Sequence, residues 1–293
     1  MSEPPGSSAA SDSEQPVCPR HPDRHTGLRC ARCDRPACPE CLREAPVGYH
    51  CVDCLKQSGG RARTSEPVTV AGARLRRSPL VVPAIVLANV VVYVLTAVQA
   101  GSAARNYASP LFTEFAMLPL PVAEGQWWRL VATGFLHLGM IHLVMNMVAL
   151  WIIGKDLELV LGRARFAAVY ALALLGGSTA VFLFGELDTP VAGASGAVYG
   201  LMGGIAVAAF RLRVSLRPVL LVIAINIVFT VSIPGISLLG HLGGLLVGAV
   251  ATGALVYAPR PRQAVWQSGA LGALVLLLAA LIITRTAQLG VLA

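Results

Sequence analysis

The stretch ISLLGHLGGLLVGAVATGALVY at residues 236–257 decides the fold class of this chain. It has 22 residues, contains no Asp, Glu, Lys or Arg, and holds one histidine, His241. An α-helix needs about 20 apolar residues to cross a bilayer. Gly240, Gly244 and Gly248 recur at every fourth residue, so one face of this helix would lack side chains and allow another helix to approach closely. The stretch therefore predicts a closely packed transmembrane helix.

Six more apolar runs lie outward from this stretch, near residues 80–99, 130–153, 164–184, 194–210, 218–234 and 267–287. Charged residues make up 13% of the 293-residue chain, against about 25% in soluble domains. This composition excludes an ordinary soluble enzyme. We expect an all-α polytopic membrane protein with a small polar domain in front of it.

The charges gather at the N-terminal end, where residues 1–78 hold 21 of the 38 charged side chains. We divide the chain into a disordered N-terminus (1–16), a cysteine-rich domain (17–56), a linker (57–78) and a membrane domain (79–290). The net charge of +8 is better explained by membrane topology than by nucleic-acid binding, and we expect no nucleic-acid partner.

The Lys and Arg residues near the spans fall mainly on one side of the membrane. That side receives Arg74, Arg76, Arg77, Lys155, Arg163, Arg165, Arg211, Arg213, Arg217, Arg260 and Arg262, whereas the other receives Arg105, Arg129 and Arg285. The positive-inside rule then places the N-terminus and the cysteine-rich domain in the cytoplasm and the C-terminus outside. A composition rich in Ala, Gly and Arg favours a bacterial source, and we expect the protein in the bacterial cell membrane.

The seven cysteines and one histidine form four pairs with a two-residue gap: Cys18 and His21, Cys30 and Cys33, Cys38 and Cys41, Cys51 and Cys54. Eight such ligands suffice for two tetrahedral zinc ions. A region of this size cannot build much of a core, so metal would supply its folding energy. A reducing cytoplasm disfavours disulfides. The sequence therefore predicts two structural zinc ions without an open position for catalysis.

The order of the four pairs resembles a B-box-type zinc finger, in which alternate pairs share one ion. The resemblance implies that the first and third pairs hold one zinc and the second and fourth pairs the other. Spacing alone leaves sequential pairing open, and His25 or His50 could replace a neighbouring cysteine. A finger of this kind suggests a cytoplasmic protein partner.

Three histidines, His137, His142 and His241, lie within the apolar runs, where ionisable side chains are costly and mark candidate functional sites. The stretch GASGAVYG at residues 193–200 places Ser195 at the N-terminal end of the fourth span. A helix N-terminus offers free N–H groups that suit a developing oxyanion. We expect Ser195 and His241 at matched depth, in the outer half of the membrane.

Glycines also recur every fourth residue in the fourth span, at Gly196, Gly200 and Gly204. Two helices with such glycine faces could bring a serine and a histidine within hydrogen-bond distance. Small residues also serve plain helix packing, and glycine faces occur in transporters, so this pattern alone leaves those alternatives open. No acidic residue lies in the outer half of either span, and a Ser–His dyad is the most that the sequence supports.

His142 and Asn146 are four residues apart and share a helix face, where both could donate hydrogen bonds to an oxyanion. Hydrogen bonds between helices are the alternative role for this pair. His137 lies about 140° round the same expected helix, so we expect it to point elsewhere and brace the preceding loop.

Together these pieces resemble the rhomboid intramembrane serine proteases, over about residues 80–257. The matching stretches are WWR (127–129), HLGMIHLVMN (137–146), Glu158 to Arg163 after the second span, GASGAVYG (193–200) and GHLGGLLVG (240–248). The resemblance implies a six-helix core, here with a seventh C-terminal span and a zinc-binding domain in front.

The resemblance also implies roles for individual residues. Ser195 would be the nucleophile and His241 the general base, with Asn146, His142 and the Ser195 amide as the oxyanion hole. Supporting positions would be His137, Tyr199, Gly193, Gly196, Trp128 and Arg129. Tyr199 would pack against the base, and Trp128 and Arg129 would match the motif of the first loop.

The expected function is therefore a serine endopeptidase that cleaves transmembrane segments of membrane proteins within the lipid bilayer, without a cofactor for the catalytic step. One alternative is a catalytically silent protein that binds transmembrane clients while its zinc finger recruits a cytoplasmic partner. Another is a transporter whose histidines relay protons; it would need inverted repeats, and the sequence contains no convincing one.

Overall fold

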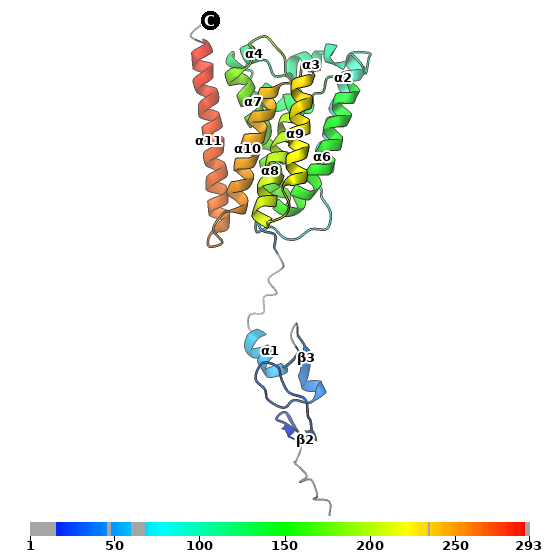
Figure 1. The fold of residues 1–293 in the computed structure, drawn as a ribbon, viewed down its shortest axis with the longest axis vertical. Coiled ribbons are helices and arrows are strands. Elements are labelled where there is room, and N and C mark those ends of the chain that lie inside the picture. Colours follow the sequence, from blue (N-terminus) through cyan, green and yellow to red (C-terminus); the bar gives the residue numbers. More distant parts are fainter. Residues whose placement is uncertain (1–15, 46–47, 60–67, 234, 291–293) are drawn as a thin grey trace, which may run out of the picture. The chain divides into compact units, whose positions relative to one another are not determined.

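A computed structural model describes residues 16–45, 48–59, 68–233 and 235–290. The chain divides into two compact units, Met1–Ser65 and Glu66–Ala293 (Figure 1). The predicted disordered N-terminus lies outside the described residues except for its last residue, Pro16, as does the linker stretch 60–67.

The N-terminal unit consists of short elements around buried cysteines. Its elements are β1 (Val17–Cys18), β2 (His21–His25), the 3-10 turn η1 (Pro39–Cys41), β3 (Leu42–Glu44), β4 (Tyr49–Cys51) and α1 (Val52–Gly59). β1 pairs with β2 and β3 with β4, both antiparallel. Among the described residues of this unit, the buried apolar side chains other than Ala37 and Leu42 are cysteines. Such a core is too small to stabilise a fold by hydrophobic burial alone.

The second unit is a helix bundle (Figure 1). Its long helices are α2 (Val81–Gln99), α6 (Gly139–Leu161), α7 (Arg163–Phe184), α8 (Ser195–Leu212), α9 (Arg217–Ser232), α10 (Leu238–Val256) and α11 (Gln263–Gly290). Short elements fill the loop before α6: η2 (Asn106–Ala108), α3 (Pro110–Phe115), α4 (Pro119–Ala123), α5 (Arg129–Ala132) and η3 (Thr133–Phe135).

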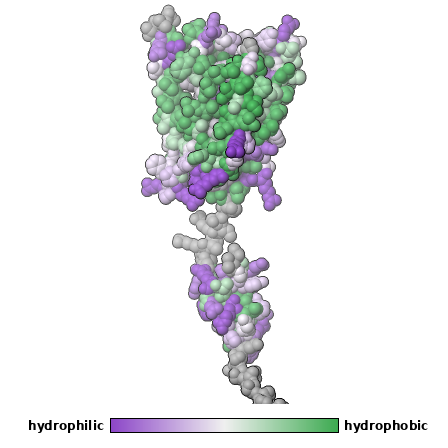
Figure 2. All heavy atoms as spheres, in the orientation of Figure 1, coloured by the Kyte–Doolittle hydropathy of each residue, from purple (hydrophilic) through white to green (hydrophobic). Residues whose placement is uncertain are grey.

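Five helices of the described chain, α2, α7, α8, α10 and α11, are long and apolar enough to cross a membrane. The α5–η3 segment and α6 together make a sixth, bent by 92°, and α9 is a shorter apolar helix of 16 residues. Figure 2 shows apolar side chains over most of the visible bundle face and polar ones at its two ends. The predicted all-α polytopic fold, with a seventh C-terminal helix, is confirmed.

The second span differs from its predicted range of 130–153. Its long helix begins only at Gly139, whose φ of +80° breaks it from the preceding turn, and ends at Leu161. The stretch from Glu158 therefore starts inside this helix rather than after it. Glu158 is buried because its carboxylate accepts hydrogen bonds at 2.7–3.0 Å from the N–H groups of residues 80–82, at the start of α2.

Residues 68–78, part of the expected linker, fall in the same compact unit as the long helices. Ala71 is fully buried in the main core, and its carbonyl oxygen accepts a hydrogen bond from Gln267 of α11 at 3.0 Å. Gln267 also bonds the carbonyl of Leu255 at 2.8 Å. The composition of this segment suggests a linker, because it does not reveal that a small residue in a turn can pack against the ends of helices.

The glycine faces of α8 and α10 meet, as their spacing predicts. A methyl group on Gly244 would overlap the carbonyl of Gly196, and one on Gly248 would overlap the backbone of Gly200. No side chain larger than hydrogen fits at these crossings. The close approach brings the N-terminal turns of the two helices together.

Candidate active site and metal clusters

Ser195 is the first residue of α8, and the backbone just before it requires glycine. Gly193 has φ +137°, a conformation that other residues rarely adopt, and its N–H donates to the carbonyl of Thr133 at 3.0 Å. A β-carbon on Gly193 would lie 2.9 Å from the Nε2 atom of His142 and 3.5 Å from the Ser195 hydroxyl. This turn therefore holds Ser195 and His142 close to one another.

His241 lies in the first turn of α10, which is fixed by a hydroxyl cap. The Ser237 side chain accepts a hydrogen bond from the Gly240 N–H at 3.1 Å. His241 and Ser195 line one cavity, together with Gly193, Gly196 and Ser178 among others. The structure thus brings the two residues of the predicted dyad to a common space.

The imidazole of His241 is 5% exposed and is held on two sides. The Tyr199 ring stacks on it, with centroids 3.9 Å apart and an angle of 15° between the planes. Tyr199 is one turn after Ser195, at the position where the family resemblance implies an aromatic residue against the base. On the other side, the Nδ1 atom of His241 lies 2.8 Å from the Thr230 hydroxyl oxygen.

Thr230 of α9 is a residue that the sequence analysis missed. Its hydroxyl also lies 2.6 Å from the Tyr199 hydroxyl and 2.8 Å from the Asn226 carbonyl. The signal in the sequence was a hydroxyl inside an apolar run. Threonines are common in such runs because the hydroxyl can hydrogen-bond to its own helix backbone, so this one did not stand out.

His142 and Asn146 both lie in the first two turns of α6. The Nδ1 atom of His142 accepts a hydrogen bond from the Leu138 N–H at 3.2 Å, which leaves the proton on Nε2, toward Gly193. Asn146 is buried and donates one amide proton to the His142 carbonyl at 2.9 Å. Its second amide proton is available for another acceptor.

His137 differs from the expectation that it points away from His142. It lies before α6 rather than on it, so its direction does not follow helical geometry, and the two rings meet edge to face with centroids 5.2 Å apart. The loop is braced through backbone contacts instead. Asn106, also missed from sequence, donates to the His137 carbonyl at 2.7 Å and accepts from the Gly139 N–H at 2.9 Å.

Arg129 ties the long loop before α6 together from inside. It is buried, and its guanidinium donates to the carbonyls of Thr113 and Ala116 at 2.8 Å and to the Gln126 side chain at 2.7 Å. Trp128 is 46% exposed, as suits an aromatic side chain at a membrane interface. Neither residue lines the cavity of Ser195.

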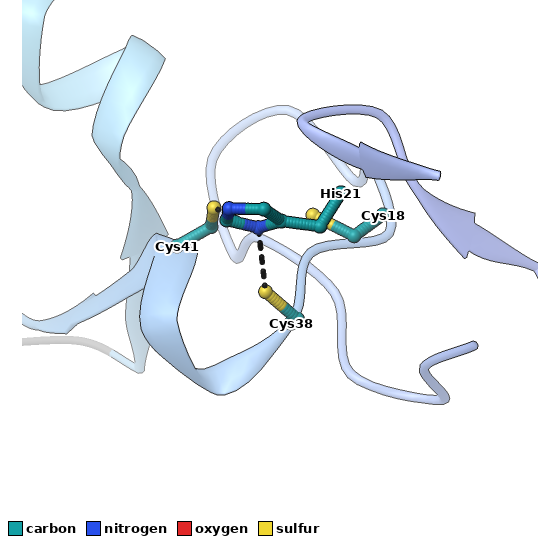
Figure 3. A group of neighbouring side chains, drawn as sticks. All are labelled: Cys18, His21, Cys38 and Cys41. Carbon is teal, nitrogen blue, oxygen red and sulfur yellow. Dashed lines mark hydrogen bonds between the residues drawn. The ribbon is translucent and has the colours of Figure 1, made fainter. Parts of the chain in front are cut away.

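The N-terminal unit contains two groups of metal-ligating side chains. Within each group the ligand atoms lie within 4.8 Å of one another; the groups are Cys18, His21, Cys38 and Cys41, and Cys30, Cys33, Cys51 and Cys54. Figure 3 shows the first group, with the His21 ring beside Cys38 and Cys41 and with Cys18 next to them. Its Nδ1 atom lies 3.3 Å from the Cys38 sulfur and 3.4 Å from that of Cys41. Alternate pairs meet, and neither group includes His25 or His50.

The backbone around these groups favours thiolates. N–H groups of residues 38, 20 and 21 lower the pKa of the Cys18 thiol to about 6. Burial raises the pKa of Cys30, but N–H groups of residues 51, 32 and 33 outweigh it and bring the value to about 6. Hydrogen bonding with the Cys33 thiol and burial raise the pKa of Cys54 to about 12, so this thiol keeps its proton while no cation is near. A divalent cation replaces that proton and stabilises the thiolate, so four converging ligand atoms in each group fit a tetrahedral metal ion.

Comparison with known proteins gives one family model, described as "Rhomboid domain", which matches residues 124–259. The rhomboid protease GluP of Bacillus subtilis is 38% identical over 139 residues, covering 46% of this chain and 27% of that protein. RHOMBOID-like protein 4 of Arabidopsis thaliana is 35% identical over 134 residues, covering 43% and 34%. The human rhomboid-related protein 3 is 30% identical over 118 residues, covering 40% and 29%. The chain thus spans less than half the length of each of these relatives.

Proposed function

The membrane unit of this multi-pass integral membrane protein contains a rhomboid domain, and from that premise we propose that it is an intramembrane serine endopeptidase. Its substrates would be membrane proteins, cut within or next to a transmembrane helix. The observation that carries the proposal is the common cavity of Ser195 and His241, in which the imidazole is held by Tyr199. The relative from Bacillus subtilis, which is named a rhomboid protease, supports the same class of reaction.

In the proposed mechanism, His241 removes the proton of the Ser195 hydroxyl while the serine oxygen attacks the scissile carbonyl carbon. The tetrahedral intermediate collapses when the protonated imidazole gives its proton to the leaving amine. This breaks the C–N bond and leaves an ester on Ser195. A water molecule, deprotonated by His241, then hydrolyses that ester and restores the free serine.

The negative oxygen of the intermediate would be stabilised by three donors. They are the N–H of Ser195 at the start of α8, the Nε2–H of His142 and the free amide proton of Asn146. Losing one donor of this kind typically lowers kcat by about 100- to 1,000-fold. The same helix N-terminus adds the positive end of its dipole.

The substrate must expose a carbonyl that a helix normally hides in its own hydrogen bonds. We therefore propose substrates whose helices unwind easily, with glycine, proline or polar residues near the cut. The distribution of Lys and Arg favours a cytoplasmic N-terminus, an external C-terminus and a site in the outer half of a bacterial membrane.

We propose further that each Cys/His group of the N-terminal unit holds one zinc ion, with four protein ligands and a structural role. A folded finger on the cytoplasmic side would recruit a protein partner. The catalytic step itself uses only protein side chains and water.

The experiment is cleavage of tagged single-span reporters by purified full-length protein in liposomes. Wild type should cleave, Ser195→Ala and His241→Ala should not, and two controls outside the site, Ser268→Ala and His50→Ala, should behave as wild type. Cleavage that survives Ser195→Ala would contradict the nucleophile. A wild type that captures reporters without cutting them would instead support a silent client-binding protein.

A further inference from the structure

α9 fully buries one side chain in the bundle, that of Thr230. Among its 16 residues, all of them described, only Thr230 is buried, at 4% exposure. Its hydroxyl oxygen has three partners, the Asn226 carbonyl at 2.8 Å, the Tyr199 hydroxyl at 2.6 Å and the His241 Nδ1 at 2.8 Å. The first partner alone would satisfy a buried threonine. The contacts with Tyr199 and His241 are therefore not required to satisfy the buried hydroxyl group.

Counting protons assigns the direction of all three hydrogen bonds. A threonine hydroxyl has one proton and two lone pairs. The Asn226 carbonyl can only accept, so that proton points to it, and both other partners must donate. Tyr199 donates its O–H and His241 donates an Nδ1–H. The neutral imidazole then carries its proton on Nδ1 and has its lone pair on Nε2.

We propose that Thr230 is a positioning residue that holds His241 in the tautomer required of the general base. It takes the place that a carboxylate holds in a Ser–His–Asp triad, as a neutral acceptor supplied by another helix. Among the described residues, no Asp or Glu hydrogen-bonds the His241 ring. Tyr199 fixes the plane of that ring from the face, and Thr230 fixes its rotation and its proton from the edge.

This inference rests on the proposed protease activity, because the tautomer matters only if Nε2 accepts a proton. Without an acceptor at Nδ1, the imidazole proton can move to Nε2, where it blocks the removal of the serine proton. In the triad enzymes, a wrong tautomer lowers kcat by about 10⁴-fold. A neutral hydroxyl is a weaker acceptor than a carboxylate, so we expect a smaller loss here, on the order of 10- to 100-fold.

The kinetic test compares Thr230→Val, which keeps the shape, with Thr230→Ser, which keeps the hydroxyl. The matched control is Thr252→Val, a fully buried threonine further along α10. Thr230→Val should lower kcat for a cleaved reporter by about 10- to 100-fold with little change in KM. Thr230→Ser should restore most of the rate, and Thr252→Val should keep it.

The second test reads the tautomer without any catalysis. Full-length Ser195→Ala protein is labelled with ¹⁵N-histidine, and the His241 signals are identified by their loss in His241→Gln. We expect one protonated nitrogen at Nδ1 and one unprotonated at Nε2, and a shift toward Nε2–H when Thr230→Val is added.

Two results would overturn the inference: an Nε2–H tautomer in the presence of Thr230, or a kcat of Thr230→Val equal to that of Thr252→Val. A rate for Thr230→Ser as low as for Thr230→Val would show a packing role instead. A wild type without proteolysis would contradict the proposed function, whereas the ¹⁵N spectrum would still decide the tautomer.

Discussion

The Tyr199 ring lies nearly parallel to the His241 imidazole, with 3.9 Å between the ring centroids. The two residues come from α8 and α10, whose glycine faces allow the helices to touch backbone to backbone. A stack of this kind stabilises the pair by about 0.5–1.5 kcal/mol beyond its buried area. It also restricts the imidazole to one plane beside the cavity of Ser195.

Removing the Tyr199 ring should therefore release the base. We expect Tyr199→Ala to lower kcat by about 10-fold. The stack holds the imidazole in its orientation, and losing roughly 1.4 kcal/mol of that stabilisation corresponds to a factor of ten in rate. Tyr199→Phe keeps the ring and should retain most of the rate. The measurement is reporter cleavage with both variants at equal folded amounts. A Phe variant as slow as the Ala variant would assign the effect to the hydroxyl.

The helix crossing can be tested at Gly244. Gly244→Ala would place a methyl group on the Gly196 carbonyl, so α8 and α10 must separate. We expect a loss of about 1–3 kcal/mol in unfolding free energy and a fall in cleavage rate, because Ser195 and His241 move apart. The readout is thermal unfolding in detergent alongside cleavage.

Gly253→Ala is the matched control for that change. It lies on the same helix, and its added methyl would meet only Val207 at 3.8 Å, an ordinary contact. It should leave both stability and rate near those of wild type. Equal behaviour of the Gly244 and Gly253 variants would contradict the close crossing.

The turn before Ser195 gives another prediction. Gly193→Ala combines an unfavourable backbone conformation at φ +137° with a clash against the His142 ring. Gly101→Ala carries backbone strain alone, since φ is +64° and no atom lies near the added methyl. Gly101→Ala should lose about 1–2 kcal/mol of stability from strain, and Gly193→Ala about 1–3 kcal/mol, but only Gly193→Ala should abolish cleavage. Full activity of Gly193→Ala would contradict the arrangement of the turn.

Zinc content tests the pairing of the metal ligands. We expect two zinc ions per full-length chain, measured by mass spectrometry of metals after dialysis. The double variant Cys18→Ser with Cys38→Ser removes two ligands of one group and should retain one ion. Sequential pairing would place those cysteines in different sites, and the variant would then bind zinc more weakly at both sites instead of keeping one site intact. Variants of His25 and His50 should keep both ions.

Acid should release the ions, because zinc binds thiolates and protons compete for them. The pKa of Cys18 and of Cys30 is already lowered to about 6 without metal, against 9.0 for a free thiol. Stability from these two ionised groups is present above the unfolded value and is lost as the pH falls through about 6. Bound zinc should therefore leave below that pH, as followed by a chromogenic chelator. Zinc content that stays the same at every pH down to acid unfolding would contradict thiolate ligation.

The parts of the fold that could be predicted are those carried by local pattern. Hydropathy predicts the membrane-spanning helices, and glycines at every fourth residue predict the contact between α8 and α10. The start of α6 was misplaced because residues 130–138 are apolar enough to extend a helix. Nothing in their composition reveals the bend at Gly139.

Within the candidate site, too, residues that local sequence pattern does not mark were not predicted. Ser195 and His241 stand out because each is a polar residue at a helix end. Thr230 does not, since its contact with His241 depends on how α9 is rotated about its axis, and an apolar helix with a nearly uniform surface does not encode that rotation. Asn106 braces His137 across 31 positions of the chain, a contact that no local pattern predicts.

The central claim is that Ser195 is a nucleophile activated by His241, and covalent labelling tests it most directly. Wild-type protein in liposomes is treated with a serine-directed fluorophosphonate, and the modified residue is located by mass spectrometry. We predict one adduct on Ser195, absent in Ser195→Ala and strongly reduced in His241→Ala. Labelling that persists in Ser195→Ala, or an adduct on another residue of the wild type, would contradict the account.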